Sequence, residues 1–191
     1  MSFSLTVLRT AAKSDRRQDR EAKKFWSREH SANFTRRQDI SSLDYLQIPL
    51  DKLPLYKLRS LGMSDSADSL TSLSNEKIIN LSKYSNTDLK LMYGAANLED
   101  LTYFDTNFTS LIRLLDKIGN ELIASEQIDL AVVFLEYAVS IESDITSTFT
   151  SLGNIYAERK QSDKLSALVK TAKGITSLSG PIIVTKLNNI K

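Results

Sequence analysis

His30 is the only histidine of the chain, so a catalytic triad or a multi-histidine metal centre would have to be built around it. It lies in a charged segment that is poor in apolar residues, which is an unfavourable setting for a buried active site. Two carboxylate pairs, Glu99 with Asp100 and Asp129 with Glu136, have the residue types of a general acid and a general base. Their spacing is that of ordinary surface carboxylates. These residues therefore favour a non-enzymatic protein.

Motifs that bind phosphates, metals or redox cofactors are absent from the sequence. It contains no G-x-x-x-x-G-K-[ST] phosphate loop, no G-x-G-x-x-G turn and no H-E-x-x-H helix. Because it has no cysteine, it offers no thiol nucleophile, no disulfide framework and no cysteine-based metal site. We therefore expect no cofactor and no metal.

The composition is that of a helix-rich globular protein. The 191 residues suffice for one or at most two domains, and 41% of them are apolar and 25% charged. The chain has only 6 Gly and 3 Pro, which favours helices over strands and turns. No run approaches the roughly 20 apolar residues of a transmembrane helix, and the short apolar start lacks the features of a signal peptide.

Positive charge is concentrated near the N-terminus. Residues 9–37 contain ten Lys or Arg and four Asp or Glu, whereas the rest of the chain has 15 basic and 19 acidic residues. The same stretch lacks Gly and Pro and is rich in helix formers, so residues 1–39 are predicted to form a basic helical arm. The cations that define this arm are Arg16, Arg17, Arg20, Lys23, Lys24, Arg28, Arg36 and Arg37.

Three interpretations of the basic arm remain open. It is a solvated or partly disordered helix, or it attaches to an anionic membrane surface with Phe25 and Trp26 in the headgroup region. Binding to nucleic acid is the third and weakest interpretation, because no base-reading motif accompanies the basic charge.

An apolar segment that cannot be helical follows the arm. Pro49 and Pro54 break any helix between residues 40 and 55, although half of these residues are apolar. If it were exposed to water, this segment would form a large hydrophobic patch, so we expect an extended strap packed on a helical body. Residues 60–74 contain six Ser and are predicted to be a loop or mobile linker. Strap and linker together occupy residues 40–74.

The remaining residues, 75–191, are predicted to form a helical domain. Shorter helices are expected at about 75–83 and 87–103, the second with Asn86 or Thr87 as its N-cap. Beyond them, apolar residues recur at spacings of three and four, which is typical of longer helices.

An internal repeat of 34 residues is the most specific pattern in this domain. Leu115-x2-Ile118-Gly119-x2-Leu122 aligns with Phe149-x2-Leu152-Gly153-x2-Tyr156. A Gly inside a helix costs about 1 kcal/mol relative to Ala, so Gly119 and Gly153 indicate a neighbouring helix that approaches too closely for a side chain. The residues expected to pack between helices are Ile118, Gly119, Leu122, Ala131, Leu135, Ala138, Leu152, Gly153, Tyr156, Val169 and Ala172.

This pattern resembles the tetratricopeptide repeat, a 34-residue helix–turn–helix unit with the pattern W-x2-L-G-x2-Y, then A-x3-F, then P. The chain departs from it at Leu165, which replaces a small residue, and at Ser143 and Ser177, which stand where the pattern has Pro. The resemblance implies an all-α antiparallel helix-hairpin array, or α-solenoid, with its clearest repeats at about 112–178 and a closing helix at 180–190.

The resemblance also implies a function. In this family the first helix of each pair lines a concave groove that takes up peptides, so we expect an adaptor or scaffold with a protein or peptide partner. Asn120 and Asn154 are central, because an amide can grip a peptide backbone through two donors and an acceptor; alternatively they are solvated polar residues, or the strap occupies the groove in cis. The implied groove residues are Arg113, Asp116, Asn120, Ile123, Thr150, Asn154 and Ala157.

A second resemblance concerns the order of the segments before the repeats. Residues 40–45, 48–54 and 81–90, preceded by the basic Phe–Trp stretch, are similar to bacterial repeat-containing proteins that are often held by one N-terminal transmembrane helix. If residues 3–8 are the remnant of such an anchor, the body lies at the cytoplasmic face of a membrane, because basic residues beside a span stay inside. The competing hypothesis is a nucleic-acid-associated regulatory protein that uses the basic arm on phosphates.

Overall fold

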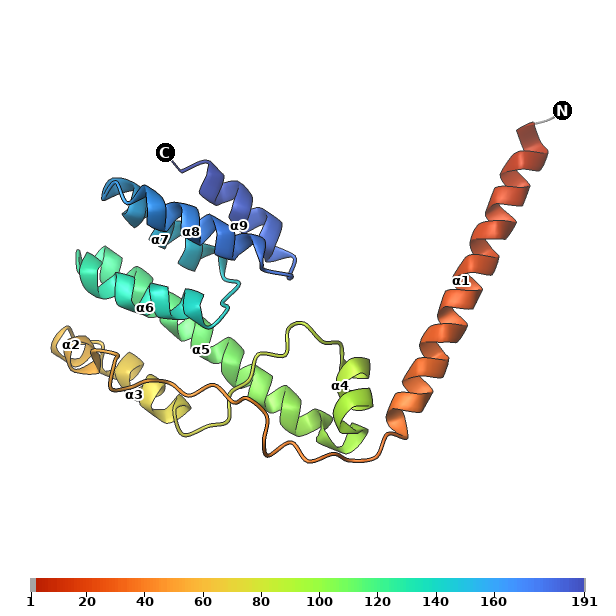
Figure 1. The fold of residues 1–191 in the computed structure, drawn as a ribbon, viewed down its shortest axis with the longest axis horizontal. Helices are drawn as coiled ribbons and strands as arrows, with labels where there is room; N and C mark the ends of the chain where they lie inside the picture. Colours follow the sequence, from red (N-terminus) through yellow and green to blue (C-terminus); the bar gives the residue numbers. More distant parts are fainter. Residues whose placement is uncertain (1–2, 191) are drawn as a thin grey trace. The chain divides into compact units, whose positions relative to one another are not determined.

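The computed structural model of the chain describes the backbone of residues 3–190 and the side chains of residues 18–190. Within this range the protein is helical and forms no strand, so the predicted all-α class is confirmed (Figure 1). The helices in chain order are α1 (Phe3–Asn33), α2 (Leu55–Ser60), α3 (Ser64–Leu73), α4 (Asn86–Tyr93), the 3₁₀ turn η1 (Ala95–Asn97), α5 (Leu98–Ala124), α6 (Ile128–Ser140), α7 (Thr146–Glu158), α8 (Ser162–Lys173) and α9 (Ser179–Asn188).

Two compact units share the chain, and each is built from two separate stretches of sequence. Unit 1 contains residues 3–43 and 84–102. Unit 2 contains residues 44–83 and 103–190. Neither unit is therefore a continuous segment.

In unit 1 the last turns of α1 pack against α4. The long helix expected for the basic arm is present and ends at Asn33. The Arg28 guanidinium pairs with Asp88, and the Lys90 ammonium pairs with Glu29. The hydrogen bond from Lys90 is also the main reason that the pKa of Glu29 lies below its ordinary value. Charged side chains of both signs thus fix the C-terminal end of α1.

A capping box starts α4. Ser85 Oγ accepts a hydrogen bond from the N–H of Asp88, and the Asp88 carboxylate accepts one from the N–H of Ser85. The N-cap is therefore Ser85, one or two residues before the predicted Asn86 or Thr87. The hydrogen bonds from Ser85, followed by the one from Arg28, lower the pKa of Asp88 to about 2.

Residues 36–38, which follow α1, pack closely against Gly94 and Asn97, and we call this contact the joint of unit 1. The Asn97 side chain is fully buried, and its Nδ2 donates to the carbonyl oxygens of Gln38 and Tyr93, both at 2.7 Å. Its Oδ1 accepts a hydrogen bond from Arg37 Nε at 2.9 Å. Beside it, Gly94 has a φ of +89°, and a Cβ there would lie 2.7 Å from backbone atoms of residues 36 and 37. A side chain at Gly94 has no room.

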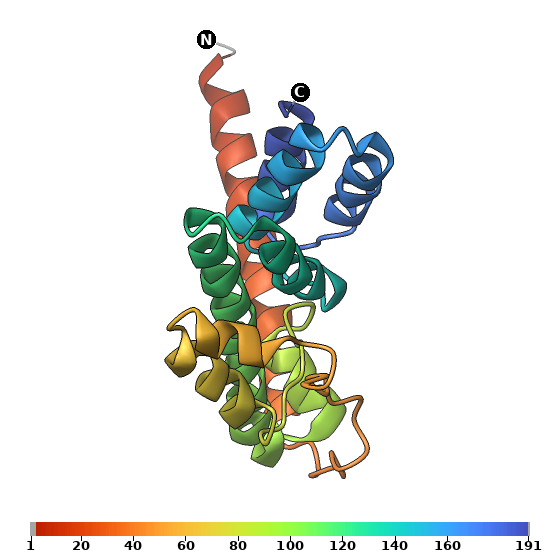
Figure 2. The same ribbon diagram turned by 90° about the vertical axis from the view of Figure 1, so that its left-hand side faces the viewer.

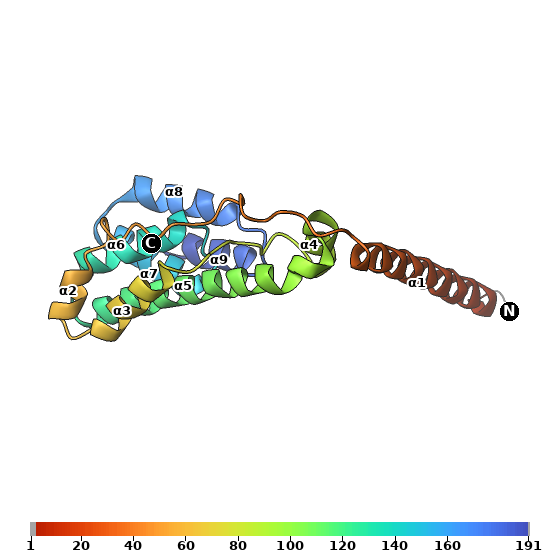
Figure 3. The same cartoon turned by 90° about the horizontal axis from the view of Figure 1, so that it is seen from below.

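The strap contributes to the hydrophobic core of unit 2, as its apolar pattern predicts. Ile48 and Leu53 are buried in the cluster that contains Leu111 and Leu115 of α5. The strap remains free of helix up to residue 54, and α2 and α3 follow it beside α5 (Figure 3).

The prediction of a loop over residues 60–74 is wrong, because α3 fills most of this stretch. Ala67 and Leu70 of α3 are fully buried, and Met63 and Leu73 pack against the same cluster. These residues recur at helical spacing, and their burial outweighs the low helix propensity of the serines between them.

The predicted helix at 75–83 is also wrong, because these residues run without helical structure along α5. The N–H of Ile79 donates to the carbonyl of Phe104 at 3.3 Å, and the N–H of Leu81 donates to the Asp105 carboxylate at 2.8 Å. Ile78 is fully buried, and its carbonyl oxygen accepts a hydrogen bond from the N–H of Leu46 in the strap. The strap and α5 therefore both fix this segment.

α5 with α6 and α7 with α8 form two helix hairpins (Figure 2). Their turns have the same backbone conformation at an offset of 34 residues. Glu126 and Lys160 both have left-handed backbone, with φ values of 59° and 56°. The next residue in each hairpin donates its N–H back to the carbonyl of Leu122 or Tyr156, at 2.8 Å in both. Each first helix therefore ends in a Schellman motif.

The residues predicted to pack between helices are in the interior of unit 2. A Cβ at Gly119 would lie 2.4 Å from the Leu135 side chain of α6, and one at Gly153 would lie 2.7 Å from Leu187 of α9. α9 coincides with the predicted closing helix. Val169 is half-buried, and the buried members are Ile118, Gly119, Leu122, Ala131, Leu135, Ala138, Leu152, Gly153, Tyr156 and Ala172.

Candidate functional site

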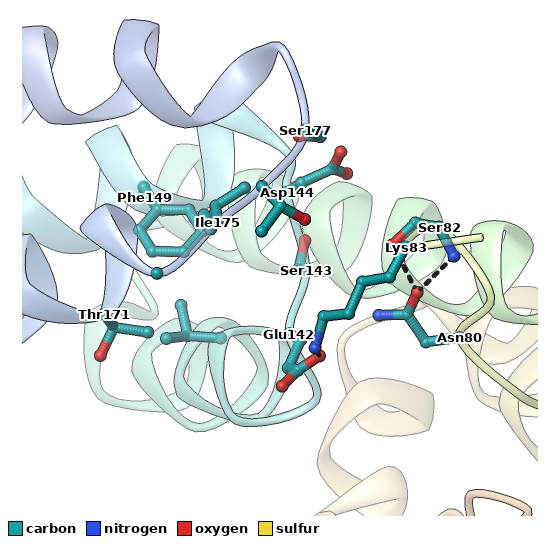
Figure 4. A pocket seen from close by; sticks show the side chains of 13 residues that line it. Asn80, Ser82, Lys83, Glu142, Ser143, Asp144, Phe149, Thr171, Ile175 and Ser177 are labelled. Atoms are coloured by element: carbon teal, nitrogen blue, oxygen red, sulfur yellow. Dashed lines mark hydrogen bonds and ion pairs between the residues drawn. The ribbon is translucent and has the colours of Figure 1, made fainter. Parts of the chain in front are cut away.

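Two pockets adjoin at the loop of residues 141–145, which connects α6 to α7 in unit 2. The first, here called the α8-side pocket, has a volume of about 140 Å³ and reaches α8 and the loop before α9 (Figure 4). The second, the α5-side pocket, has a volume of about 300 Å³ and lies along α5. Ser82, Glu142 and Asp144 line both pockets, so the two form one candidate site.

The α8-side pocket combines an apolar floor with polar side chains. Val139, Phe149 and Ile175 supply the floor, and Ser143 and Ser177 are polar residues of the lining. Ser143 is fully buried, and the buried Oγ of Ser177 has no hydrogen-bond partner within residues 18–190. A buried hydroxyl without a partner costs free energy, so a ligand group that bonded to it would recover that cost.

Ser143 and Ser177 are also the sequence signal for this pocket. They stand 34 residues apart, at the two places where the repeat has Ser in place of Pro. Proline would bring neither a hydroxyl nor a backbone N–H to the pocket. This departure is visible in the sequence, but the predicted binding surface lies on the first helices of the hairpins.

An ion pair spans the rim shared by the two pockets. Lys83 Nζ lies 2.9 Å from Glu142 Oε2, and it ties the segment before α4 to the loop after α6 (Figure 4). Both side chains are more than half exposed, so the pair adds little to stability. Nearby, Asn80 Oδ1 accepts hydrogen bonds from the N–H and the hydroxyl of Ser82. These contacts define the position of the rim.

Arg113 is the predicted groove residue that lines the candidate site. It is exposed and lies with Phe108 and Ile112 in the wall of the α5-side pocket. Acidic side chains outnumber basic ones by one at the two pockets, and the charged residues are Asp105, Glu142, Asp144, Lys83 and Arg113.

Asp116 and Asn120 connect α5 to α7 in the structure. The Asp116 carboxylate accepts hydrogen bonds from the hydroxyls of Ser147 at 2.9 Å and Thr148 at 2.7 Å. Asn120 Oδ1 accepts one from Ser151 at 2.7 Å, and its Nδ2 donates to the Asp116 carbonyl at 2.9 Å. Their predicted role in partner binding stays a prediction, and it would compete with these internal bonds.

The other predicted groove residues have different environments. Asn154 is exposed, whereas its repeat equivalent Asn120 is half-buried. Ile123, Thr150 and Ala157 are half-buried, and the Thr150 hydroxyl donates to the carbonyl of residue 146 at 3.1 Å. The two asparagines therefore do not form an equivalent pair.

The cations of the basic arm also differ in their surroundings. Arg20, Lys23, Lys24 and Arg36 are exposed. Arg28 and Arg37 have partners in unit 1: Asp88 for the first, and Asn97 with Asp100 for the second. Arg16 and Arg17 lie in α1, and their side chains are outside the described residues.

Two tyrosines of unit 2 show how a polar group is accommodated near the core. The Tyr156 hydroxyl donates to Glu136 Oε1 at 2.6 Å, and Lys164 Nζ lies 3.0 Å from the same oxygen. Burial alone would raise the pKa of Glu136, but these two partners outweigh burial and leave the pKa below its ordinary value. The Tyr137 hydroxyl is buried without a hydrogen-bond partner in the described residues, and burial raises its pKa to about 12.

Substituting these tyrosines with Phe is expected to change stability in opposite directions. Tyr156→Phe should lower the free energy of unfolding by about 1–2 kcal/mol, because Glu136 loses a charge-assisted hydrogen bond. Tyr137→Phe should raise it by up to about 1 kcal/mol, because an unpartnered hydroxyl is removed. Urea denaturation at neutral pH measures both. Equal effects would contradict the assigned hydrogen bonding.

The contribution of Glu136 should also depend on pH. Because its pKa is lowered in the folded protein, its stabilising effect is fully present above its ordinary pKa and is lost as the pH falls through the folded value. The stability difference between wild type and Tyr156→Phe should therefore shrink on acidification. A difference that stays unchanged as the pH falls throughout the acidic range in which the protein remains folded would show that the carboxylate is not involved.

The described part of the chain gives no sign of a metal centre or of a membrane span. Among these residues no group of three His, Asp or Glu side chains could hold a metal ion. No helix within them has the length and hydropathy needed to cross a bilayer. Searches of protein-family models, curated proteins and solved structures gave no match to the chain.

Proposed function

We propose that the chain is a non-enzymatic adaptor or scaffold that binds a protein or peptide partner through unit 2. The observation that carries this proposal is the α8-side pocket, where the unpartnered Ser177 hydroxyl adjoins an apolar floor. A peptide supplies both matching groups: an apolar side chain for the floor, and a backbone carbonyl or N–H for the hydroxyl. The resemblance to tetratricopeptide repeats, which take up peptide segments, supports the same class of function.

The charges of the site indicate the kind of peptide. Because acids exceed bases by one at the two pockets, a segment with Lys or Arg next to the apolar residue is favoured over an acidic one. The small volume of the α8-side pocket suits a single side chain. In keeping with the second resemblance, we further propose that the module works at the cytoplasmic face of a membrane.

Selection from a random peptide display library on the full chain tests this function. The enriched peptides should share an apolar residue beside a basic one, and their affinities can then be measured by fluorescence polarisation. Ser177→Ala should weaken binding about three- to tenfold, the value of one hydrogen bond. Ser166→Ala, at an exposed position of α8 outside both pockets, is the matched control and should bind like wild type. No common motif, or equal affinities for the two variants, would contradict the proposal.

The same substitution has an expected effect on stability that separates a binding role from a structural one. Ser177→Ala should leave the free energy of unfolding unchanged or raise it by up to about 1 kcal/mol, because the removed hydroxyl has no hydrogen-bond partner among residues 18–190. Urea denaturation of wild type and variant measures the difference. A loss of more than about 1 kcal/mol would mean that the fold itself uses the hydroxyl.

A further inference from the structure

The charges of α1 are separated onto two sides of the helix. At 3.6 residues per turn, all eight Lys and Arg positions between residues 9 and 28 fall within an arc of about 140°. The four acidic positions, Asp15, Asp19, Glu21 and Glu29, fall within the remaining arc. We call the first side the basic face, and its positions are Arg9, Lys13, Arg16, Arg17, Arg20, Lys23, Lys24 and Arg28.

The two aromatic residues of α1 lie away from the basic face. Phe25 and Trp26 are each about 130° from its centre around the helix axis. They are 55% and 67% exposed, and Glu29 and Asp19 share their side of the helix. The interpretation in which cations and aromatics enter one headgroup layer together is therefore unfavourable, because the aromatic side would carry acids into that layer.

We propose that the basic face of α1 adsorbs to a flat anionic lipid surface, with Phe25 and Trp26 remaining in water. Arg28, at one end of the basic face, is paired with Asp88. The other seven basic positions, from residue 9 to residue 24, follow one side of α1 over about 22 Å at 1.5 Å per residue, and one plane can meet all seven. Each Lys or Arg near such a surface adds to the attraction. This inference concerns unit 1 and does not depend on peptide binding by unit 2.

The same separation of charges disfavours nucleic acid. In a major groove, phosphate strands flank a helix on both sides, where Asp19 and Glu21 lie about 90–110° from the centre of the basic face. Those carboxylates would meet phosphates of like charge. A single-stranded nucleic acid would need aromatic residues for base stacking and cations for its phosphates on the same side of the helix. In α1, Phe25 and Trp26 lie away from the cations, so this mode of binding is disfavoured as well.

The test is vesicle co-sedimentation with the full chain and a permuted variant of equal composition. Gln18→Lys, Arg20→Ala, Ala22→Arg and Lys24→Gln together move two cations from the basic face to the opposite side. All four positions are exposed, and the net charge is unchanged. Wild type should bind vesicles of phosphatidylcholine mixed with phosphatidylglycerol, and not phosphatidylcholine alone. The variant should bind at least about tenfold more weakly, since each displaced cation is worth about 1 kcal/mol and 1.4 kcal/mol is a factor of ten.

Trp26 is the only tryptophan of the chain and reports the orientation of α1. On binding, its emission should stay that of an exposed indole and remain quenchable by iodide. Three outcomes would overturn the proposal: equal binding by the permuted variant, a blue shift of Trp26 on binding, or binding to duplex DNA without binding to the anionic vesicles. Loss of peptide binding by unit 2 would leave these results unaffected, so the two proposals can fail separately.

Discussion

Gly94→Ala is expected to destabilise unit 1 by roughly 2–4 kcal/mol, because the substitution combines backbone strain with a clash. The φ of +89° is a conformation that residues other than Gly rarely adopt. The added Cβ would also lie 2.7–2.8 Å from backbone atoms of Arg36 and Arg37, which cannot rotate away as a side chain would. The bonds of Asn97 that hold the same joint should weaken with it.

Native-state hydrogen exchange locates this effect, and a second glycine controls for strain. Amides of α4 and of the last turns of α1 should lose protection, whereas those of α7 and α9 in unit 2 should keep it. Gly62 has a φ of +80° but nothing within 4 Å of its Cβ position, so Gly62→Ala should cost only about 1 kcal/mol. Equal costs for the two substitutions would show that the joint has room for a side chain.

Gly119→Ala is expected to lower the free energy of unfolding by about 1–3 kcal/mol, although Ala is the better helix former by about 1 kcal/mol. The reason is Leu135, whose Cδ2, Cγ and Cδ1 atoms lie 2.4, 2.6 and 3.3 Å from the position of the new Cβ. Leu135 is fully buried in the core cluster of α7, α8 and α9, so its side chain has nowhere to move.

A double-mutant cycle with Leu135→Ala tests this contact. The single Leu135→Ala substitution should cost about 2–5 kcal/mol through the cavity that it leaves. In the double variant the methyl group introduced at position 119 has room, so the combined loss should be smaller than the sum by at least about 1 kcal/mol. Circular dichroism during urea denaturation measures all four proteins. Additive losses would mean that Gly119 and Leu135 do not limit the approach of α5 and α6.

Local sequence patterns predicted several elements of the fold correctly. The 34-residue offset of the hairpins and the buried Gly119 and Gly153 follow from helical periodicity and from the cost of Gly in a helix. The extended strap follows from its two prolines. In these places backbone preference and burial point to the same structure.

Two segments were mispredicted where tertiary contacts override composition. Serines made residues 60–74 look like a loop, yet burial of Ala67 and Leu70 stabilises α3. Residues 75–83 have apolar spacing that fits a helix, but hydrogen bonds to residues 46, 104 and 105 hold their backbone in another form. Such bonds to distant residues leave no periodic trace in a single sequence.

The candidate site was predicted only in part. The expected groove includes Arg113, which lines the α5-side pocket, but it also includes Asp116 and Asn120, which bond to α7. The type of a residue shows which hydrogen bonds its side chain can make, whereas the partner of those bonds depends on how the helices pack. Ser143 and Ser177 were visible in the sequence as departures from the repeat. That both line one pocket could be seen only from the way the structure brings their two loops together.

The discontinuity of unit 1 has a consequence for the protein as it is being made. Arg28 joins Asp88 across 60 residues of chain, and Glu29 joins Lys90 across 61. At about 5–20 residues per second, a ribosome needs several seconds to add that much chain. During this interval the last turns of α1 lack the helix that fixes them, and the positive charge of the arm is already outside the ribosome. The arm can therefore meet an anionic surface before either unit has closed.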